Sequence, residues 1–81
     1  MSNRDKLKRL FMDIFILSEA DFRFDLKREE ITTWDSLGTV SMAVGVQETF
    51  GYHFTPMEAM GVTGVQDIIR ILESKGISFS G

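Results

Sequence analysis

The sequence predicts an all-α protein, a four-helix bundle with a short third helix and a long loop between the first two helices. Apolar residues recur at helical spacing in three separate segments of the chain. Residues that favour helix N-caps precede the predicted helices, and glycines follow the second and the last. Only one short stretch alternates as a strand would, and a lone strand is not stable in water. The 81 residues correspond to a single domain, residues 1–81.

The composition is that of an ordinary folded domain, with 43% hydrophobic and 26% charged residues. There is no cysteine, so the chain has neither a disulfide nor a cysteine-bound zinc ion. This is typical of a reducing compartment, and we expect a cytoplasmic monomer. No apolar run reaches the roughly 20 residues of a membrane span. A net charge of −3 disfavours nucleic acid as a partner. The initial methionine and the short tails favour a free-standing protein.

The first helix is predicted over residues 3–16, with Ser2 or Asn3 as its cap. One apolar stripe follows the i, i+3, i+4, i+7 spacing: Leu7, Leu10, Phe11 and Ile14. Basic and acidic side chains occupy most of the remaining positions, as expected for an amphipathic helix.

Residues 17–34 are expected to form an ordered loop. Phe22, Phe24 and Leu26 alternate with charged residues, but no other segment offers a convincing partner strand. We expect these aromatic residues, with Ile31 and Trp34, to close one end of the core. A loop of this length in a small domain indicates either a function or a buried anchoring role.

The second helix is predicted from Asp35 or Ser36 to about Phe50, ending at Gly51. In the next segment Thr55, Pro56 and Glu58 supply a cap, a proline at the first helical position and a capping box. They predict a short third helix over residues 56–60.

The segment Thr63-Gly64-Val65-Gln66 repeats the capping-box pattern and opens the last helix. This helix is predicted to run to about Ser74, with Gly76 after it. Its buried stripe is formed by Val65, Ile68, Ile69 and Leu72.

The second helix has two apolar faces. One carries Met42, Val46 and Phe50, flanked by Thr39 and Ala43. The opposite face carries Leu37, Val40 and Val44, bordered by Ser41 and Glu48. Either the helix is central and packed on both sides, or the second face is exposed and binds partners.

The second helix begins with Asp35-Ser36-Leu37. Ser36 stands in the first turn, where free backbone N–H groups and the positive end of the helix dipole suit a phosphate. An ordinary helix start would also use aspartate and serine here.

On these residues the chain resembles the acyl carrier protein family. The match begins with Trp34 and the D-S-L motif at Asp35-Ser36-Leu37, and covers essentially the whole chain. Further positions agree with the family pattern: Val40, Glu48-Thr49-Phe50, Glu58-Ala59, Val65-Gln66, Ile68, Ile69 and Leu72.

The resemblance implies a carrier with no catalysis of its own. A phosphopantetheinyl transferase would attach 4′-phosphopantetheine from coenzyme A to Ser36, between Asp35 and Leu37. The thiol of this arm would hold acyl groups as thioesters for loading and processing enzymes, as in fatty acid biosynthesis. The partner-binding residues would be Leu37, Val40, Ser41, Val44 and Glu48. An acyl chain would lie among Met42, Val46, Phe50, Ala59, Val62 and Ile69.

The charge pattern departs from that of carriers in general fatty acid synthesis. Gly38, Ser41 and Gln47 stand where the second helix of such carriers often has acids, and Glu48 is the main carboxylate beyond Asp35. We therefore expect a specialised carrier in a dedicated lipid or secondary-metabolite pathway. Two alternatives stay open: an aminoacyl or peptidyl carrier of the same fold, and an unmodified helical interaction module.

Two other kinds of site are not favoured. His53 is the only histidine and would have to reach Ser36 from another part of the bundle, and no nucleophile elbow surrounds Ser36. We therefore do not expect a hydrolase. The loop acids do not match EF-hand spacing, and we expect no metal site: Asp21, Asp25, Glu29 and Glu30.

Overall fold

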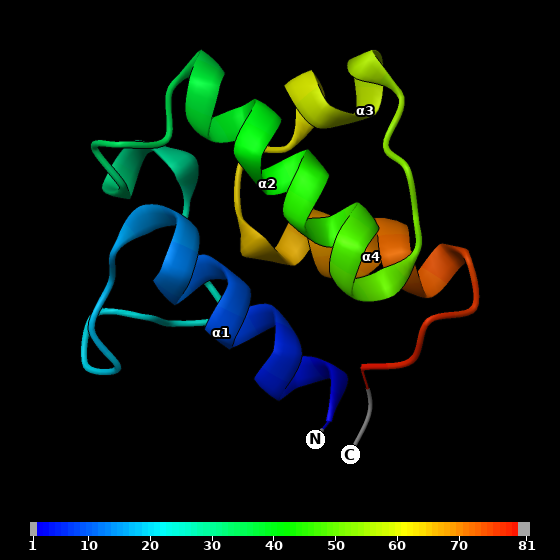
Figure 1. Cartoon of the computed structure of the whole chain (residues 1–81), viewed down its shortest axis with the longest axis horizontal. Helices are drawn as coiled ribbons and strands as arrows, with labels where there is room; N and C mark the ends of the chain where they lie inside the picture. Colours follow the sequence, from blue (N-terminus) through cyan, green and yellow to red (C-terminus); the bar gives the residue numbers. More distant parts are fainter. Residues whose placement is uncertain (1, 80–81) are drawn as a thin grey trace.

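The computed structural model describes residues 2–79, and these residues form four α-helices (Figure 1). The helices are α1 (Asn3–Phe15), α2 (Ser36–Phe50), α3 (Pro56–Gly61) and α4 (Val65–Ser74). A single 3-10 turn, η1 (Arg28–Glu30), interrupts the long loop between α1 and α2. The predicted all-α bundle, with its short third helix and long loop, is confirmed.

Most helix ends are set by the predicted caps. Ser2 Oγ accepts a hydrogen bond from the Asp5 backbone N–H at the start of α1, at 3.1 Å. Gly51 ends α2 in the left-handed region, with φ 77°. At α3, the Thr55 hydroxyl and the Glu58 carboxylate accept hydrogen bonds from each other's backbone N–H groups. Local sequence therefore fixes where these helices begin and end.

The predicted capping box of α4 is wrong. Gly64 is the N-cap and has no side chain, while Gln66 donates instead to the backbone carbonyl of Phe24 at 2.9 Å. The Asp67 carboxylate takes the place of Gln66. It accepts bonds from the Thr63 hydroxyl at 2.6 Å and the Thr63 backbone N–H at 2.8 Å. A carboxylate is the stronger acceptor, and these bonds lower the pKa of Asp67.

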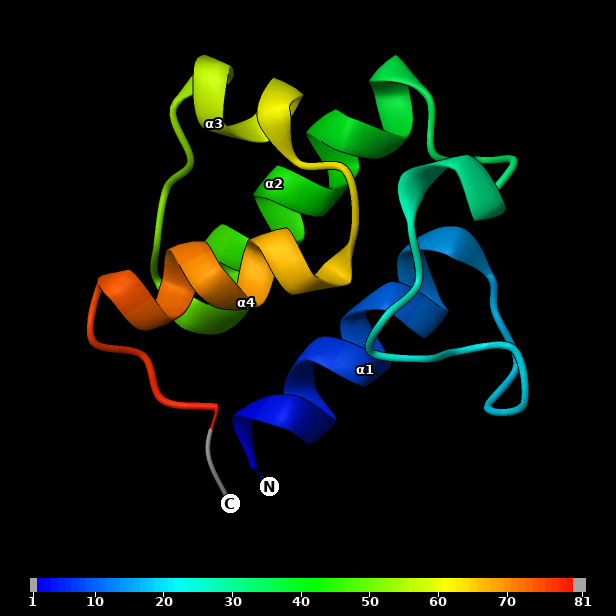
Figure 2. The ribbon, with the colours of Figure 1, turned by 180° about the vertical axis from the view of Figure 1, so that it is seen from behind.

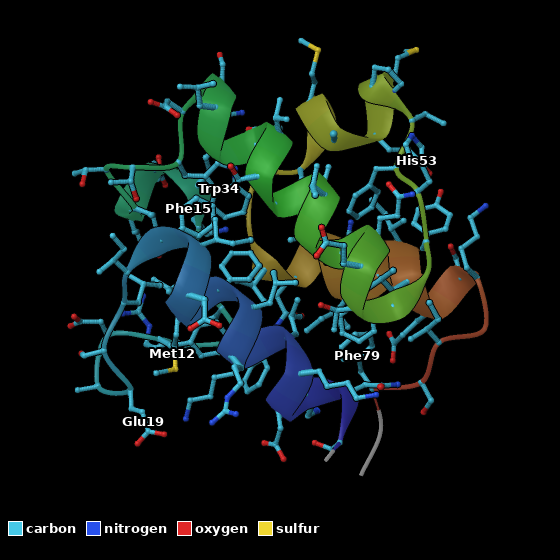
Figure 3. All side chains as sticks on the ribbon, in the orientation of Figure 1. Met12, Phe15, Glu19, Trp34, His53 and Phe79 are labelled. Carbon is cyan, nitrogen blue, oxygen red and sulfur yellow. The ribbon has the colours of Figure 1, made fainter. Side chains whose placement is uncertain are left out.

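The loop from residue 17 to residue 34 closes one end of the core, as predicted. Phe22, Leu26, Ile31 and Trp34 are all buried. The Trp34 ring stacks on Phe15 with centroids 5.1 Å apart, which anchors the chain directly before α2 (Figure 3).

The same loop is attached to the start of α4. The Arg28 N–H donates to the Thr63 carbonyl at 2.7 Å, and the Val65 N–H donates to the Leu26 carbonyl at 2.9 Å. Lys27 and Gly64 form an isolated antiparallel bridge between these bonds. The loop is thus held by tertiary contacts as well as by its own aromatic residues.

The core lies between α1, α2 and α4, with α4 crossing behind α2 in Figure 1 and in front of it in the reverse view of Figure 2. A Cβ atom at Gly45 would lie 2.8 Å from Ile14 Cδ1, so this glycine lets α1 and α2 approach closely. Phe79, which the sequence pattern did not single out, is 1% exposed and packs against Phe50. The buried apolar residues come from every helix except α3 and from the loops: Leu7, Leu10, Phe11, Phe15, Phe22, Leu26, Ile31, Trp34, Met42, Val46, Phe54, Val62, Val65, Ile68, Ile69, Leu72 and Phe79.

Within residues 2–79, none of the helices combines the length and the apolar character that crossing a membrane requires.

Candidate functional site

Ser36 is the first residue of α2 and is exposed to solvent. Asp35 caps the helix, with its carboxylate accepting a hydrogen bond from the Gly38 N–H at 2.9 Å. The Asp35 carbonyl accepts from the Thr39 N–H at 2.8 Å. Among residues 2–79, the Ser36 hydroxyl makes no hydrogen bond, so it is free to react. The first turn predicted for Ser36 is confirmed.

The backbone around Ser36 is held from both sides. Trp34 is buried in the aromatic cluster two residues before it. Two residues after it, Gly38 packs so closely that a Cβ atom would lie 2.6 Å from the Thr33 carbonyl oxygen and 3.0 Å from the Phe15 ring. Ser36 therefore projects from a rigid turn.

The second apolar face of α2 is exposed. Leu37 is 77%, Val40 60% and Val44 48% exposed, while Met42 and Val46 on the opposite face are fully buried. Ser41 and Glu48, which border this face, are also exposed. Of the two readings that the sequence left open, the structure supports the exposed one. We call these five residues the α2 face: Leu37, Val40, Ser41, Val44 and Glu48.

An apolar groove of about 520 Å³ runs from Ser36 along α2 toward α3. Its size is within the range of small-molecule sites. Thr39 lies in this groove; it is 6% exposed, and its hydroxyl has no hydrogen-bond partner among the described residues. The groove is lined by Arg28, Ser36, Thr39, Val40, Ala43, Val44, Gln47, His53, Phe54, Pro56, Ala59 and Met60.

The six residues expected to surround an acyl chain are only partly associated with this groove. Ala59 lines it. Met42, Val46, Val62 and Ile69 are buried in the core and do not line it. Phe50 is half-buried and packs against Phe79. The groove is therefore not lined by the residue set expected from the sequence, and Ala59 alone belongs to both.

Few polar side chains lie along the groove, and His53 is one of them. His53 Nδ1 lies 2.7 Å from Gln47 Oε1 and is not hydrogen-bonded to Ser36 in the described part of the chain (Figure 3). Outside the groove lining, a hydrogen bond from the Tyr52 hydroxyl to Glu58, 2.6 Å long, lowers the pKa of Glu58 and raises that of Tyr52. This bond fixes the segment that leads from α2 to α3.

Arg28 is the cation of the groove, and sequence reasoning missed it. The residue is partly buried, and its Nε donates to the Trp34 carbonyl at 3.1 Å. Nothing in the sequence pattern distinguishes it from the neighbouring Lys27, because the approach of η1 to the start of α2 is a tertiary feature.

Two of the loop acids, Asp25 and Glu30, pair with Arg23. Arg23 Nε lies 3.0 Å from Asp25, and Arg23 Nη2 lies 2.9 Å from Glu30. Asp21 and Glu29 are exposed. Over the residues that the structure describes, no group of three or more histidine, cysteine, aspartate or glutamate side chains is arranged to hold a metal ion.

Comparison with known proteins finds a similar acyl carrier protein. The acyl carrier protein of Coprothermobacter proteolyticus (strain ATCC 35245 / DSM 5265 / OCM 4 / BT) is 26% identical over 69 residues. The match covers 85% of this chain and 84% of that protein. No family model matches the chain, and no solved structure matches it significantly.

Proposed function

Because the chain is similar to an acyl carrier protein over most of its length, we propose that it is a carrier that holds acyl intermediates on a 4′-phosphopantetheine arm attached to Ser36. The observation that carries this proposal is the position of Ser36. It is an exposed serine with a free hydroxyl, at the start of a long helix and at the end of an apolar groove.

The surroundings of Ser36 suit the arm chemically. The Ser36 oxygen attacks the phosphorus atom that joins phosphopantetheine to the rest of coenzyme A. A new P–O bond forms, 3′,5′-adenosine bisphosphate leaves with the electrons of the broken bond, and the serine proton passes to the transferase. Asp35 keeps the helix start in place, and the helix dipole favours the phosphodiester charge. When bound, the arm supplies a thiol that holds the acyl group as a thioester.

The cargo has two candidate locations beside Ser36. The open groove offers apolar walls from Val40, Val44 and Met60 without any rearrangement. The expected pocket among Met42, Val46, Phe50, Ala59, Val62 and Ile69 requires the core to open, since four of these side chains are buried. Short acyl chains would lie in the groove, and longer acyl chains would enter the core as well.

The α2 face is the proposed docking surface for partner enzymes. It combines three exposed aliphatic side chains with one carboxylate, Glu48. Apolar contact therefore contributes more to the affinity for partner enzymes here than charge attraction does. Charge attraction mainly sets the encounter rate and the selectivity. This supports a carrier specialised for a dedicated synthase, ligase or acyltransferase in a lipid or secondary-metabolite pathway.

Intact-mass measurement tests the proposal. The protein is incubated with coenzyme A, magnesium and a broad-specificity phosphopantetheinyl transferase, and then with a transferase from the source organism. We expect a gain of one phosphopantetheinyl group in the wild type and in Ser74→Ala, which removes an exposed serine of α4 outside the α2 face and the groove. Ser36→Ala should gain nothing.

Two outcomes would contradict the carrier. A wild type that stays unmodified with both transferases, or a Ser36→Ala variant that gains the same mass, leaves the unmodified interaction module as the better interpretation. Once loaded, equal turnover with housekeeping ketosynthases and with enzymes encoded beside this chain would contradict the specialised role. An arm that accepts only aminoacyl groups from its neighbouring enzymes would favour the aminoacyl or peptidyl carrier.

A further inference from the structure

The guanidinium of Arg28 has unused hydrogen-bond donors in the groove that begins at Ser36. Its Nε–H is used by the Trp34 carbonyl, and its backbone N–H by the Thr63 carbonyl. Within residues 2–79 the two Nη groups have no hydrogen bond and no carboxylate within 4.0 Å. Arg28 and Ser36 line the same groove.

Arg28 differs from the other arginines because it combines partial burial with the lack of a carboxylate partner. Within residues 2–79, Arg4 and Arg9 also lack a carboxylate partner, but both are exposed to solvent. Arg23 pairs with Asp25 and Glu30, and Arg70 Nη2 lies 3.1 Å from Asp67. Arg28 is half-buried and has only a neutral carbonyl as a partner. A partly buried cation without an anion beside it loses hydration that its partners do not replace, which is unfavourable. An anion bound beside the Arg28 guanidinium would therefore be stabilising.

The reach of the cation agrees with an anion on Ser36. The Trp34 carbonyl, which holds Arg28 Nε, is two residues before Ser36 in the chain. Consecutive Cα atoms are about 3.8 Å apart, so the Cα atoms of residues 34 and 36 are separated by at most about 7.6 Å. Figures 1 and 2 show η1, which contains Arg28, beside the segment that leads into α2. A planar guanidinium with two free Nη groups suits two oxygens of one phosphate.

We propose that Arg28 binds the phosphodiester that joins the arm to Ser36 and so holds the first part of the arm against the groove. This inference rests on the proposed carrier function. It adds a specific binding residue outside the Asp35-Ser36-Leu37 motif, from the loop between α1 and α2. The Nη groups donate to the non-bridging phosphate oxygens while Nε keeps its bond to Trp34.

The test compares thermal unfolding of the unmodified and modified protein in the wild type and in Arg28→Gln. Both forms are prepared with coenzyme A and a transferase, and modification is verified by mass. At low salt, we expect the change in Tm on modification to be more favourable in the wild type than in Arg28→Gln by about 2–4 °C. The difference should shrink in high salt. Arg28→Lys, which keeps the charge, should retain part of it.

Arg23→Gln is the matched control, since it removes an arginine from the same loop that does not line the groove. It should show the same change on modification as the wild type. The comparison is independent of any loss of stability that Arg28→Gln causes in the unmodified protein, because only the change on modification is used.

A second measurement uses only the wild-type protein, so it does not depend on whether a variant folds. In ¹⁵N NMR spectra of the wild type, the Nε–H signal of Arg28 should move on modification while that of Arg23 stays. Equal Tm changes in the wild type and Arg28→Gln, with an unmoved Arg28 signal, would overturn the assignment and leave the carrier proposal intact. This is also the result expected if Arg28 binds an acidic partner protein. A failure of Ser36 to gain mass with either transferase would overturn both.

Discussion

Replacing Gly38 with alanine tests how tightly the start of α2 is held. The added Cβ would lie 2.6 Å from the Thr33 carbonyl oxygen and 3.0 Å from a carbon of the Phe15 ring. The oxygen belongs to the backbone and cannot rotate away as a flexible side chain would, because the Trp34 N–H is bonded to the Ile31 carbonyl and the Trp34 ring is buried. The helix start must therefore shift.

The expected cost follows from two opposing effects. Overpacking of this kind costs about 1–3 kcal/mol. Alanine is preferred over glycine in a helix by at most about 1 kcal/mol, which offsets part of that cost. With a steric cost of about 2 kcal/mol, the middle of that range, the net loss in the free energy of unfolding is about 1–2 kcal/mol. This corresponds to a fall in Tm of about 4–16 °C for a domain of this size. An unaided core of this size supplies only about 3–5 kcal/mol, so the effect is easily measured.

Urea unfolding followed by circular dichroism measures the loss as a lower midpoint at unchanged slope. Gly61→Ala is the matched control. Gly61 ends α3, and a Cβ atom there would meet no atom within 4 Å. This variant should be as stable as the wild type or slightly more stable. A Gly38→Ala midpoint equal to that of the wild type would refute the steric argument, as would an equal loss in Gly61→Ala.

Two further predictions concern stability. Ile16→Gly should raise the free energy of unfolding by about 0.5–1 kcal/mol, measured in a thermal melt. Ile16 is 89% exposed, so little packing is lost, and its left-handed φ of 54° costs a branched residue about 1–2 kcal/mol. The greater freedom of glycine in the unfolded chain offsets part of that gain. Hydrogen bonds from Tyr52 and Thr63 lower the pKa values of Glu58 and Asp67 in the folded protein. These two carboxylates therefore stabilise the fold at pH values above their unfolded-state pKa values, which are about 4. That stabilisation is lost as the pH falls through their folded-state pKa values. Glu58→Gln with Asp67→Asn should therefore flatten the fall of Tm with acid.

The controls for these predictions come from the same chain. Gly51→Ala places a Cβ at φ 77° with open space around it, so it should lose stability where Ile16→Gly gains it. A lower Tm in Ile16→Gly would contradict the strain argument. For the acid response, an identical fall of Tm in the double variant and the wild type would show that these two carboxylates do not contribute.

Local signals in the sequence predicted the helices almost to the residue. Asp35, Gly51 and the Thr55–Glu58 pair act within four positions of themselves, so their effect does not depend on the rest of the fold. The capping of α4 failed for the opposite reason. Gln66 is drawn to the Phe24 carbonyl, 42 positions away in the sequence, which no local pattern reveals.

The positions of Ser36 and Leu37 could be predicted from the sequence, whereas the surroundings of Ser36 could not. Ser36 and the exposed Leu37 follow from the motif and from helical periodicity. Arg28 and the wall of the groove depend on how η1 and α3 pack beside α2, and that packing is set by the whole core. Periodicity also identified Met42 as apolar, but it could not separate a residue of the closed core from one that lines an open groove.

The bonds between the long loop and the start of α4 have a consequence for the order in which the site can form during synthesis. Arg28 and Leu26 are held by the backbone of Thr63 and Val65, so the loop gains this support only after those residues have left the ribosome. A partly made chain has Ser36 but not the support for Arg28 beside it. Under the proposed function, contact between Arg28 and a group attached to Ser36 would therefore require the finished fold.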